Sequence, residues 1–212
     1  MDENIIPFQE GLEHEGGIFR SPHLMAPSQT ALLIIDVQQR LFPAIPSGPK
    51  LAWNICRLIQ AANILELNQI VATEQYPQGL GGTIDPIHQQ LLDHHIDCRY
   101  DKIMFSCREC QPIFQQFDEH GVRKVLLTGI ETHVCVAQTG FDMLAAGFDV
   151  YVAVDAVGSR QGIDHDTALR RLESQGVTLT TTEAVMFEWC ERAGTERFKQ
   201  ISALVRQTFE QP

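Results

Sequence analysis

Six short apolar stretches, each followed by residues with helical periodicity, constrain the fold of this 212-residue chain more than any other feature. Short apolar runs that end in turn residues are typical of strands buried on both faces of a sheet. The stretches are Thr30–Asp36, Gln69–Thr73, Cys98–Phe105, Lys124–Gly129, Asp149–Val157 and Val177–Thr181. They predict an α/β fold of three layers: a doubly wound, six-stranded, mainly parallel sheet of strand order 3-2-1-4-5-6, with helices on both faces.

Helical patterns fill the segments between these stretches. They cover Leu51–Leu67, His88–His95, Pro112–His120, Val134–Ala145, His165–Gln175, Glu183–Arg192 and Glu196–Phe209. Residues 29–212 are therefore predicted to form a single domain. Residues 1–28 mix Pro, Gly, His and acidic residues without a period, which predicts an irregular N-terminal arm over the domain or over a partner subunit.

The charge and the cysteines narrow the classes of function. The formal net charge is -11, and we see no basic patch of the kind that binds a phosphate backbone, so we expect no nucleic-acid partner. We find no signal peptide and no apolar run of membrane-spanning length, so we expect no membrane association. The six cysteines are scattered, which favours free thiols and a cytoplasmic location.

Cys135 follows the fourth predicted strand and falls in the first turn of the next helix. A thiol at a helix N-terminus meets the positive end of the helix dipole, which favours the reactive thiolate. A free thiol has a pKa of about 8.5, so a catalytic cysteine needs a further cation or base. A buried cysteine that acts only as a small apolar residue is the alternative.

Two other polar residues are expected at the same edge of the sheet as Cys135. Asp36 ends the first predicted strand, and Lys102 lies in the third. In the predicted strand order the first and fourth strands are neighbours, and ligands bind at their carboxyl ends. Alternatively, Asp36 caps a turn and Lys102 is a solvated surface residue.

The motifs that carry these residues resemble the isochorismatase-like cysteine hydrolases, a family that also contains nicotinamidases. The matching segments are ALLIIDVQ, ATEQYPQGLGGT, DKIMFSC, LLTGIETHVCVAQT and VAVDAVGSR, which together span roughly residues 30–182 in the order of the family. The EQYPQGLG segment is most similar to the branch called isochorismatase domain-containing proteins.

The resemblance implies a catalytic group of Asp36, Lys102 and Cys135. It also implies a cis peptide bond between Ile130 and Glu131, and an oxyanion hole formed by the backbone N–H groups of Glu131 and Cys135. The implied activity is hydrolysis of a small amide-type or related bond through a thioester on Cys135. Physical reasoning agrees, because Lys102 would stabilise a thiolate and Asp36 could move the proton.

The loop after the second predicted strand departs from the nicotinamidases. Nicotinamidases hold a metal there with an Asp and several His, whereas this chain reads EQYPQGLGGT and has no His between residues 24 and 87. We therefore expect no metal and no cofactor, and we do not expect nicotinamide to be the substrate. The expected partners are a small-molecule substrate and, because oligomers are common in the family, further copies of the chain.

Several other residues have a functional and a structural interpretation. Phe42, Tyr76 and Phe105 flank the predicted site and either line a substrate pocket or pack in the core. His133 lies near Cys135 in sequence, but it is interpreted as a turn or pocket-wall residue rather than a catalytic base. Cys107 and Cys110 have CxxC spacing without a second ligand pair, so the motif is interpreted as incidental.

Three functions compete at this point. The first is a cysteine-dependent hydrolase. The second is a non-catalytic interaction protein that retains the fold. The third is a nucleotide-binding protein, which the sequence disfavours because the turn after the first strand, DVQQRLFPAI, lacks the GxGxxG pattern. Asp155, Ser159 and Arg160 are assigned to a structural turn in each case.

Overall fold

The predicted sheet is confirmed in the computed structural model, which describes residues 19–96 and 99–210. The strand order is β3-β2-β1-β4-β5-β6, and every neighbouring pair is parallel. The strands are β1 (Thr30–Ile35), β2 (Gln69–Gln75), β3 (Arg99–Lys102), β4 (Lys124–Ile130), β5 (Asp149–Gly158) and β6 (Thr178–Thr180). The winding therefore reverses between β1 and β4, where the sequence places Asp36 and Cys135.

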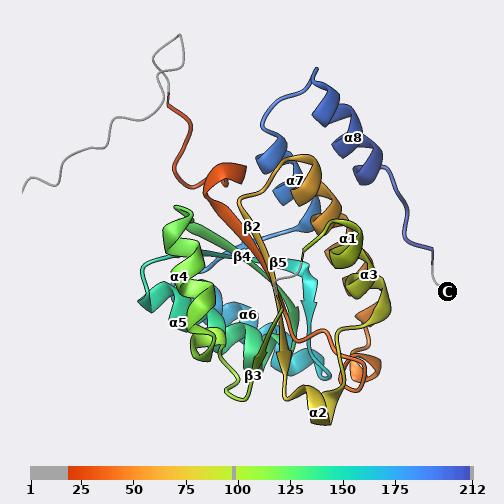
Figure 1. The fold of residues 1–212 in the computed structure, drawn as a ribbon, viewed down its shortest axis with the longest axis vertical. Coiled ribbons are helices and arrows are strands. Elements are labelled where there is room, and N and C mark those ends of the chain that lie inside the picture. The colour runs from red at the N-terminus through yellow and green to blue at the C-terminus, as the bar shows by residue number, and fades with distance from the viewer. Residues whose placement is uncertain (1–18, 97–98, 211–212) are drawn as a thin grey trace, which may run out of the picture.

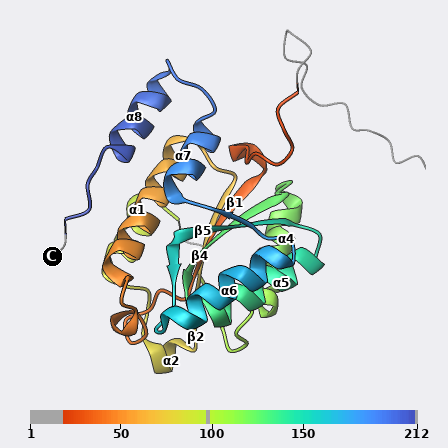
Figure 2. The same ribbon diagram turned by 180° about the vertical axis from the view of Figure 1, so that it is seen from behind.

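Helices cover both faces of the sheet (Figures 1 and 2). One face carries α1 (Gly48–Ile64), α3 (Asp85–Asp93), α7 (Thr182–Cys190) and α8 (Glu196–Val205). The other carries α4 (Gln111–Glu119), α5 (Ala137–Ala145) and α6 (Gly162–Ser174). The short helix α2 (Pro77–Leu80) follows β2 and marks, at the bottom of Figure 1, the end of the sheet where the strands finish.

Four further short turns connect these elements. They are the 3-10 turns η1 (Pro27–Gln29), η2 (Phe42–Ala44) and η3 (Cys107–Glu109), and the π-helical turn η4 (Thr132–Val136). η4 runs directly into α5, so the polypeptide between β4 and α5 is helical from Thr132 onwards. β4, η4 and α5 therefore form the succession of strand, turn and helix that the sequence predicts for this segment.

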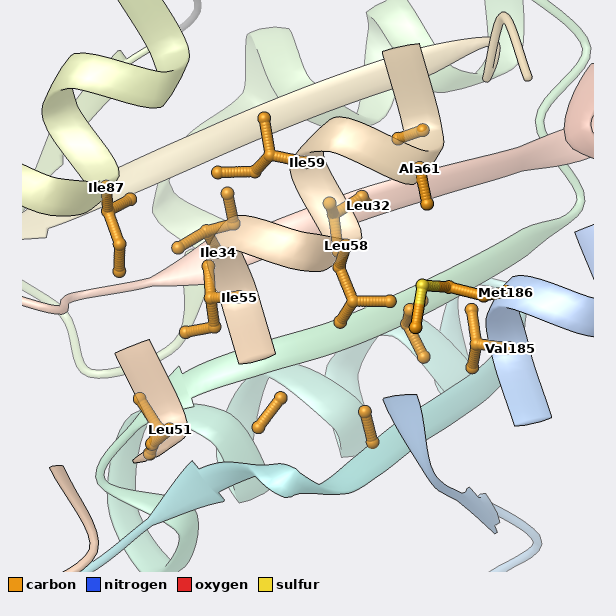
Figure 3. Close-up of a cluster of buried hydrophobic side chains, with 14 of the residues drawn as sticks. Leu32, Ile34, Leu51, Ile55, Leu58, Ile59, Ala61, Ile87, Val185 and Met186 are labelled. Carbon is orange, nitrogen blue, oxygen red and sulfur yellow. The ribbon is translucent and has the colours of Figure 1, made fainter. Parts of the chain in front are cut away.

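β1 is buried on both faces, which explains its continuous apolar sequence. Leu32 and Ile34 point toward α1 and pack with its Ile55 and Leu58, as Figure 3 shows. The alternate residues, such as Leu33, belong to the core between the sheet and α4, α5 and α6. Complete burial of one such side chain stabilises the fold by about 1.5–3 kcal/mol. A strand with this pattern can occupy only the interior of the sheet.

Two helices begin earlier than their periodicity predicts. α1 begins at Gly48 and α3 at Asp85, each three residues before the predicted starts at Leu51 and His88. In both helices a proline lies in the first turn. The first backbone N–H groups of a helix have no partner within it, so proline is tolerated there and fixes a suitable φ. Pro49 and Pro86 therefore belong to the first turns of the two helices.

Gly129 lets β1 and β4 approach each other near their carboxyl ends. Its φ is +110°, and a Cβ atom at this position would lie 2.0 Å from the carbonyl oxygen of Ile35. The register between β4 and β5 also shifts between Leu127 and Gly129. Only glycine fits this position, which lies next to Asp36 in space.

Residues 19–28 of the predicted arm pack on the domain, and residues 1–18 lie outside the described part. Met25 is fully buried, and its backbone N–H donates to Glu188 Oε2 of α7 at 3.1 Å. The hydroxyl of Tyr151 donates to the carbonyl of His23 at 2.7 Å. The described part of the arm therefore rests on the chain's own surface, near the amino ends of the strands.

No helix within residues 19–96 and 99–210 has the length and apolar character needed to cross a membrane.

Candidate active site

Asp36 lies immediately after β1 and is completely buried. Its φ is +53°, an uncommon value for a residue with a side chain, and its backbone N–H donates to the carbonyl of Thr73 at 3.1 Å. The backbone therefore turns sharply at the end of the strand. This turn carries the carboxylate at the edge of the sheet where β2, β3 and β4 also finish.

Lys102 is the last residue of β3 and is also buried, so the alternative of a solvated surface lysine is wrong. Its Nζ donates to Asp36 Oδ2 at 2.6 Å and to Gln75 Oε1 at 2.7 Å. It also donates to the backbone carbonyl of Phe105 at 2.9 Å and to that of Met104 at 3.3 Å. A buried ammonium group needs such a set of acceptors.

Cys135 lies in η4 and is 5% exposed. The Asp36 carboxylate lies close enough to the Cys135 thiol to raise the pKa of that thiol. The peptide bond between Ile130 and Glu131 is cis, at the position that the family resemblance implies. The three predicted catalytic residues are therefore brought together from β1, β3 and η4, with Asp36 in the centre.

The sequence predicts that the surroundings of Cys135 lower its pKa, but in the structure they raise it. Burial raises the pKa of the Cys135 thiol, and the negative charge of Asp36 raises it further. The positive charge of Lys102 acts in the opposite direction but is the smaller effect. Burial lowers the pKa of Lys102, but the charge of Asp36 and its hydrogen bond to Lys102 act in the opposite direction, and the pKa of Lys102 is raised. In the resting site the sulfur therefore keeps its proton and Lys102 keeps its charge.

Three polar residues that support this group are not among the predicted catalytic residues. Thr73 Oγ1 donates to Asp36 Oδ1 at 2.8 Å, and Gln75 bridges from Lys102 to the carbonyl of Ile103 at 2.6 Å. Gln38 Oε1 accepts from the backbone N–H of Gln75 at 2.8 Å. The sequence feature that could have identified them is the run of polar side chains after the apolar part of β2, which lies at the same sheet edge as Asp36.

A second polar cluster holds the turn that begins at Glu131. Glu131 is 5% exposed and accepts from Arg160 three times: from its backbone N–H at 3.0 Å, its Nε at 2.9 Å and its Nη2 at 3.1 Å. Burial raises the pKa of Glu131, but the hydrogen bonds and charge of Arg160 more than offset this, so the pKa lies below its usual value. Arg160 therefore holds the turn that begins at Glu131, in agreement with its assignment to a structural turn.

His133 is held by residues other than Cys135, in agreement with its interpretation as a turn residue. Its Nδ1 lies 3.0 Å from Ser159 Oγ, and its Nε2 lies 3.8 Å from Asp164 Oδ2. Both ring nitrogens thus face β5 and α6. A catalytic Cys–His pair would need one of them at the sulfur.

The three predicted pocket residues occupy different environments. Tyr76 and Phe105 are 51% and 53% exposed, respectively, and each lies next to a residue of the polar network. Phe42 is half-buried and packs against the α1 side of the core. Ile103 and Met104 are also exposed, so apolar side chains surround the loop that follows Lys102. A role in substrate binding stays a prediction for all three.

The CxxC motif is part of the core around the site. Cys107 and Cys110 are both buried free thiols. Cys107 Sγ lies 3.8 Å from Thr73 Oγ1, and Cys110 Sγ lies 3.7 Å from the carbonyl of Asp101. Among the described residues no group of three or more His, Cys, Asp or Glu is arranged to hold a metal ion.

The family described as Isochorismatase domain matches residues 30–184, which include every residue of this site. The chain belongs to the isochorismatase family. Isochorismatase domain-containing protein 2 of Danio rerio is 35% identical over 176 residues, which cover 83% of this chain and 86% of that protein. Membership of the isochorismatase family supports a hydrolase activity in general.

Two solved structures share the isochorismatase fold. The MAR1 ribonuclease from Caenorhabditis elegans has a TM-score of 0.78 and 33% identity, and the match covers 87% of this chain and 93% of that one. The ycaC gene product from Escherichia coli, described as an octameric hydrolase of unknown specificity, has a TM-score of 0.73 and 21% identity, with coverage of 88% and 89%. These neighbours agree with the sheet order and the layers described above.

Proposed function

We propose that this chain hydrolyses a small amide-type C–N bond, or a related bond, through a thioester on Cys135. The observation that supports this most is the central position of Asp36, which accepts a hydrogen bond from the Lys102 ammonium group and whose charge acts on the Cys135 thiol. A carboxylate in this position can accept the thiol proton, and a buried cation beside it stabilises the charges that follow.

The first half of the reaction forms the acyl-enzyme. Asp36 accepts the proton of Cys135 as the sulfur attacks the carbonyl carbon, and the backbone N–H groups of Glu131 and Cys135 hold the oxyanion. The C–N bond then breaks, and Asp36 gives the proton to the departing nitrogen. Because the resting thiol is protonated, proton transfer and attack occur together rather than from a stored thiolate.

The second half releases the acid. Asp36 accepts a proton from water, the resulting hydroxide attacks the thioester carbon, and the C–S bond breaks. The proton returns to the sulfur of Cys135. Lys102 keeps its charge throughout and holds the carboxylate in place. One amide and one water give one acid and one amine, so neither a metal nor a cofactor is needed for the balance.

Alkylation of the five described cysteines tests this proposal without a known substrate. Cys56 and Cys190 are half-buried and lie away from Asp36 and Lys102, neither of which is among the groups that shift their pKa values, whereas Cys135 is less exposed. Accessibility alone therefore predicts that Cys190 reacts before Cys135 with iodoacetamide, and activation by Asp36 predicts the reverse order. Peptide mass spectrometry over a range of pH measures each rate.

The outcome separates the hydrolase from the non-catalytic interaction protein. Selective alkylation of Cys135 that is lost in Asp36→Asn supports the hydrolase, and a screen of small amides, ureas and carbamoyl compounds then identifies the substrate. Turnover that survives in Cys135→Ala, or Cys135 reacting more slowly than Cys190, contradicts the mechanism. In that case the interaction protein becomes the better interpretation.

The names of the neighbours bear on the partners of this chain. The neighbour from Caenorhabditis elegans is called a ribonuclease. We nevertheless propose no nucleic-acid substrate for this chain, because its 27 acidic residues outnumber its 16 lysines and arginines. The Escherichia coli neighbour is octameric, and we propose that this chain also forms a homo-oligomer. Light scattering of the purified protein measures its mass directly.

A further inference from the structure

Thr73 holds Asp36 through both its backbone and its side chain. The residue lies in β2, opposite Ile35 of β1, and is 1% exposed. Its carbonyl accepts from the backbone N–H of Asp36 at 3.1 Å, and its hydroxyl donates to Asp36 Oδ1 at 2.8 Å. Lys102 binds the other oxygen, Oδ2. Each carboxylate oxygen therefore has its own donor, and the plane of the carboxylate is fixed.

Cys107 determines the direction in which the Thr73 hydroxyl donates. The Cys107 thiol is fully buried and donates to Thr73 Oγ1 over 3.8 Å. Burial raises the pKa of Cys107 to about 12, so its sulfur keeps the proton at neutral pH. A hydroxyl has one proton to donate. Because the thiol occupies an acceptor position of the hydroxyl, the hydroxyl proton points to Asp36.

We propose that Thr73 is a positioning residue that keeps the Asp36 carboxylate aimed at Cys135, and that Cys107 orients the Thr73 hydroxyl for this role. This inference rests on the proposed function, because it concerns the carboxylate that moves the proton. Without the hydroxyl, Asp36 Oδ1 loses its donor, and the carboxylate is free to turn away from the thiol.

The test is the rate of Cys135 alkylation by iodoacetamide at neutral pH in full-length Thr73→Val and Thr73→Ser. Valine keeps the shape and removes the hydroxyl, whereas serine keeps the hydroxyl. We expect the rate to fall about tenfold in Thr73→Val and by less than about twofold in Thr73→Ser. A residue that only packed in the strand would lower the melting temperature without changing this rate, and serine would not restore it.

The controls separate this inference from the proposed function. If Cys135 of the unmodified protein shows no selective reactivity, or if Asp36→Asn retains it, the proposed function itself fails. If that reactivity is present and Thr73→Val reacts at the unmodified rate, or Thr73→Ser is slowed as much as Thr73→Val, the role of Thr73 is wrong. Should Thr73→Val fail to fold, Cys107→Ala leaves the hydroxyl in place but free to turn, and an unchanged rate of Cys135 alkylation in that variant also overturns the proposal.

Discussion

Lys102 Nζ lies 2.6 Å from Asp36 Oδ2, and neither side chain is exposed to solvent. The two residues come from β3 and from the end of β1, with β2 between them. The removal of two charges from water costs several kcal/mol per ion and is offset only by good geometry and further hydrogen bonds. Thr73 and Gln75 on the intervening strand supply those bonds.

Removal of one charge of this pair is expected to destabilise the fold strongly. Asp36→Asn and Lys102→Met should each lower the free energy of unfolding by about 3–5 kcal/mol, because each leaves an uncompensated buried charge. The double variant removes both charges and should lose much less than the sum of the two. Urea unfolding of the four proteins measures this difference. Additive losses would contradict the assignment of a coupled pair.

Gly129→Ala is expected to disrupt the junction of β1 and β4. The added Cβ would lie 2.0 Å from the carbonyl oxygen of Ile35, so the strands must separate, and a loss of more than about 4 kcal/mol is expected. Gly147→Ala is the matched control, since Gly147 also has a positive φ but no atom within 4 Å of the added group. It should lose only about 1–2 kcal/mol. Similar losses measured by thermal unfolding would show that steric contact is not the cause.

Cys107 is expected to make the protein sensitive to alkaline pH. Its pKa is raised from 9.0 to about 12 by burial, so above pH 9 the unfolded chain binds fewer protons than the native protein. The stability that this group contributes is therefore complete below pH 9 and is lost as the pH rises toward 12, by at most about 1.4 kcal/mol per pH unit.

The measurement compares the slope of stability against pH in three proteins. Cys107→Ala should show a shallower decline above pH 9 than the unmodified chain, whatever its stability at neutral pH. Cys190→Ala is the control, because Cys190 is only half-buried and its pKa is raised less. Parallel slopes for the unmodified chain and Cys107→Ala would show that the buried thiol does not keep its proton.

Arg160 is expected to stabilise the turn at Glu131 at neutral pH but not in acid. Arg160→Ala leaves a buried carboxylate without its partner, and about 1–2 kcal/mol is expected to be lost at pH 7 after allowance for the solvent that screens this half-exposed arginine. The pKa of Glu131 is lowered, so this contribution exists above its ordinary pKa and disappears as the pH falls.

Melting temperatures between pH 7 and pH 3 test this expectation. The difference between the unmodified protein and Arg160→Ala should narrow as the pH falls. Arg170→Ala is the control, since Arg170 lies on α6 and its side chain donates to Thr167 Oγ1. A difference for Arg160→Ala that is constant with pH would mean that the arginine acts through packing alone.

The strand order and the residues at the strand ends could be predicted because they depend on local patterns. A run such as Thr30–Ile35 is apolar throughout and can lie only inside a sheet covered on both faces. The alternation of strands and helices then restricts the order in which strands can lie together. Asp36 and Cys135 were identified because each directly follows such a run or its turn.

Other features could not be predicted from one sequence. The third stretch has a weak strand pattern, so the burial of Lys102 became evident only from its position beside β2. The roles of Thr73, Gln75 and Arg160 depend on side chains that meet across strands. Such contacts are set by distances of a few ångströms, which periodicity does not encode.

The sequence by itself therefore determined the α/β architecture and the identity of the three central side chains, because hydrophobic periodicity and the residues at strand ends are local properties. Only the tertiary structure decided that the Cys135 thiol is protonated at rest and that Thr73 and Lys102 divide the two oxygens of Asp36 between them. The physical reason is that a pKa depends on burial and on the positions of nearby charges. Those charges come from separate strands, and folding alone brings them together.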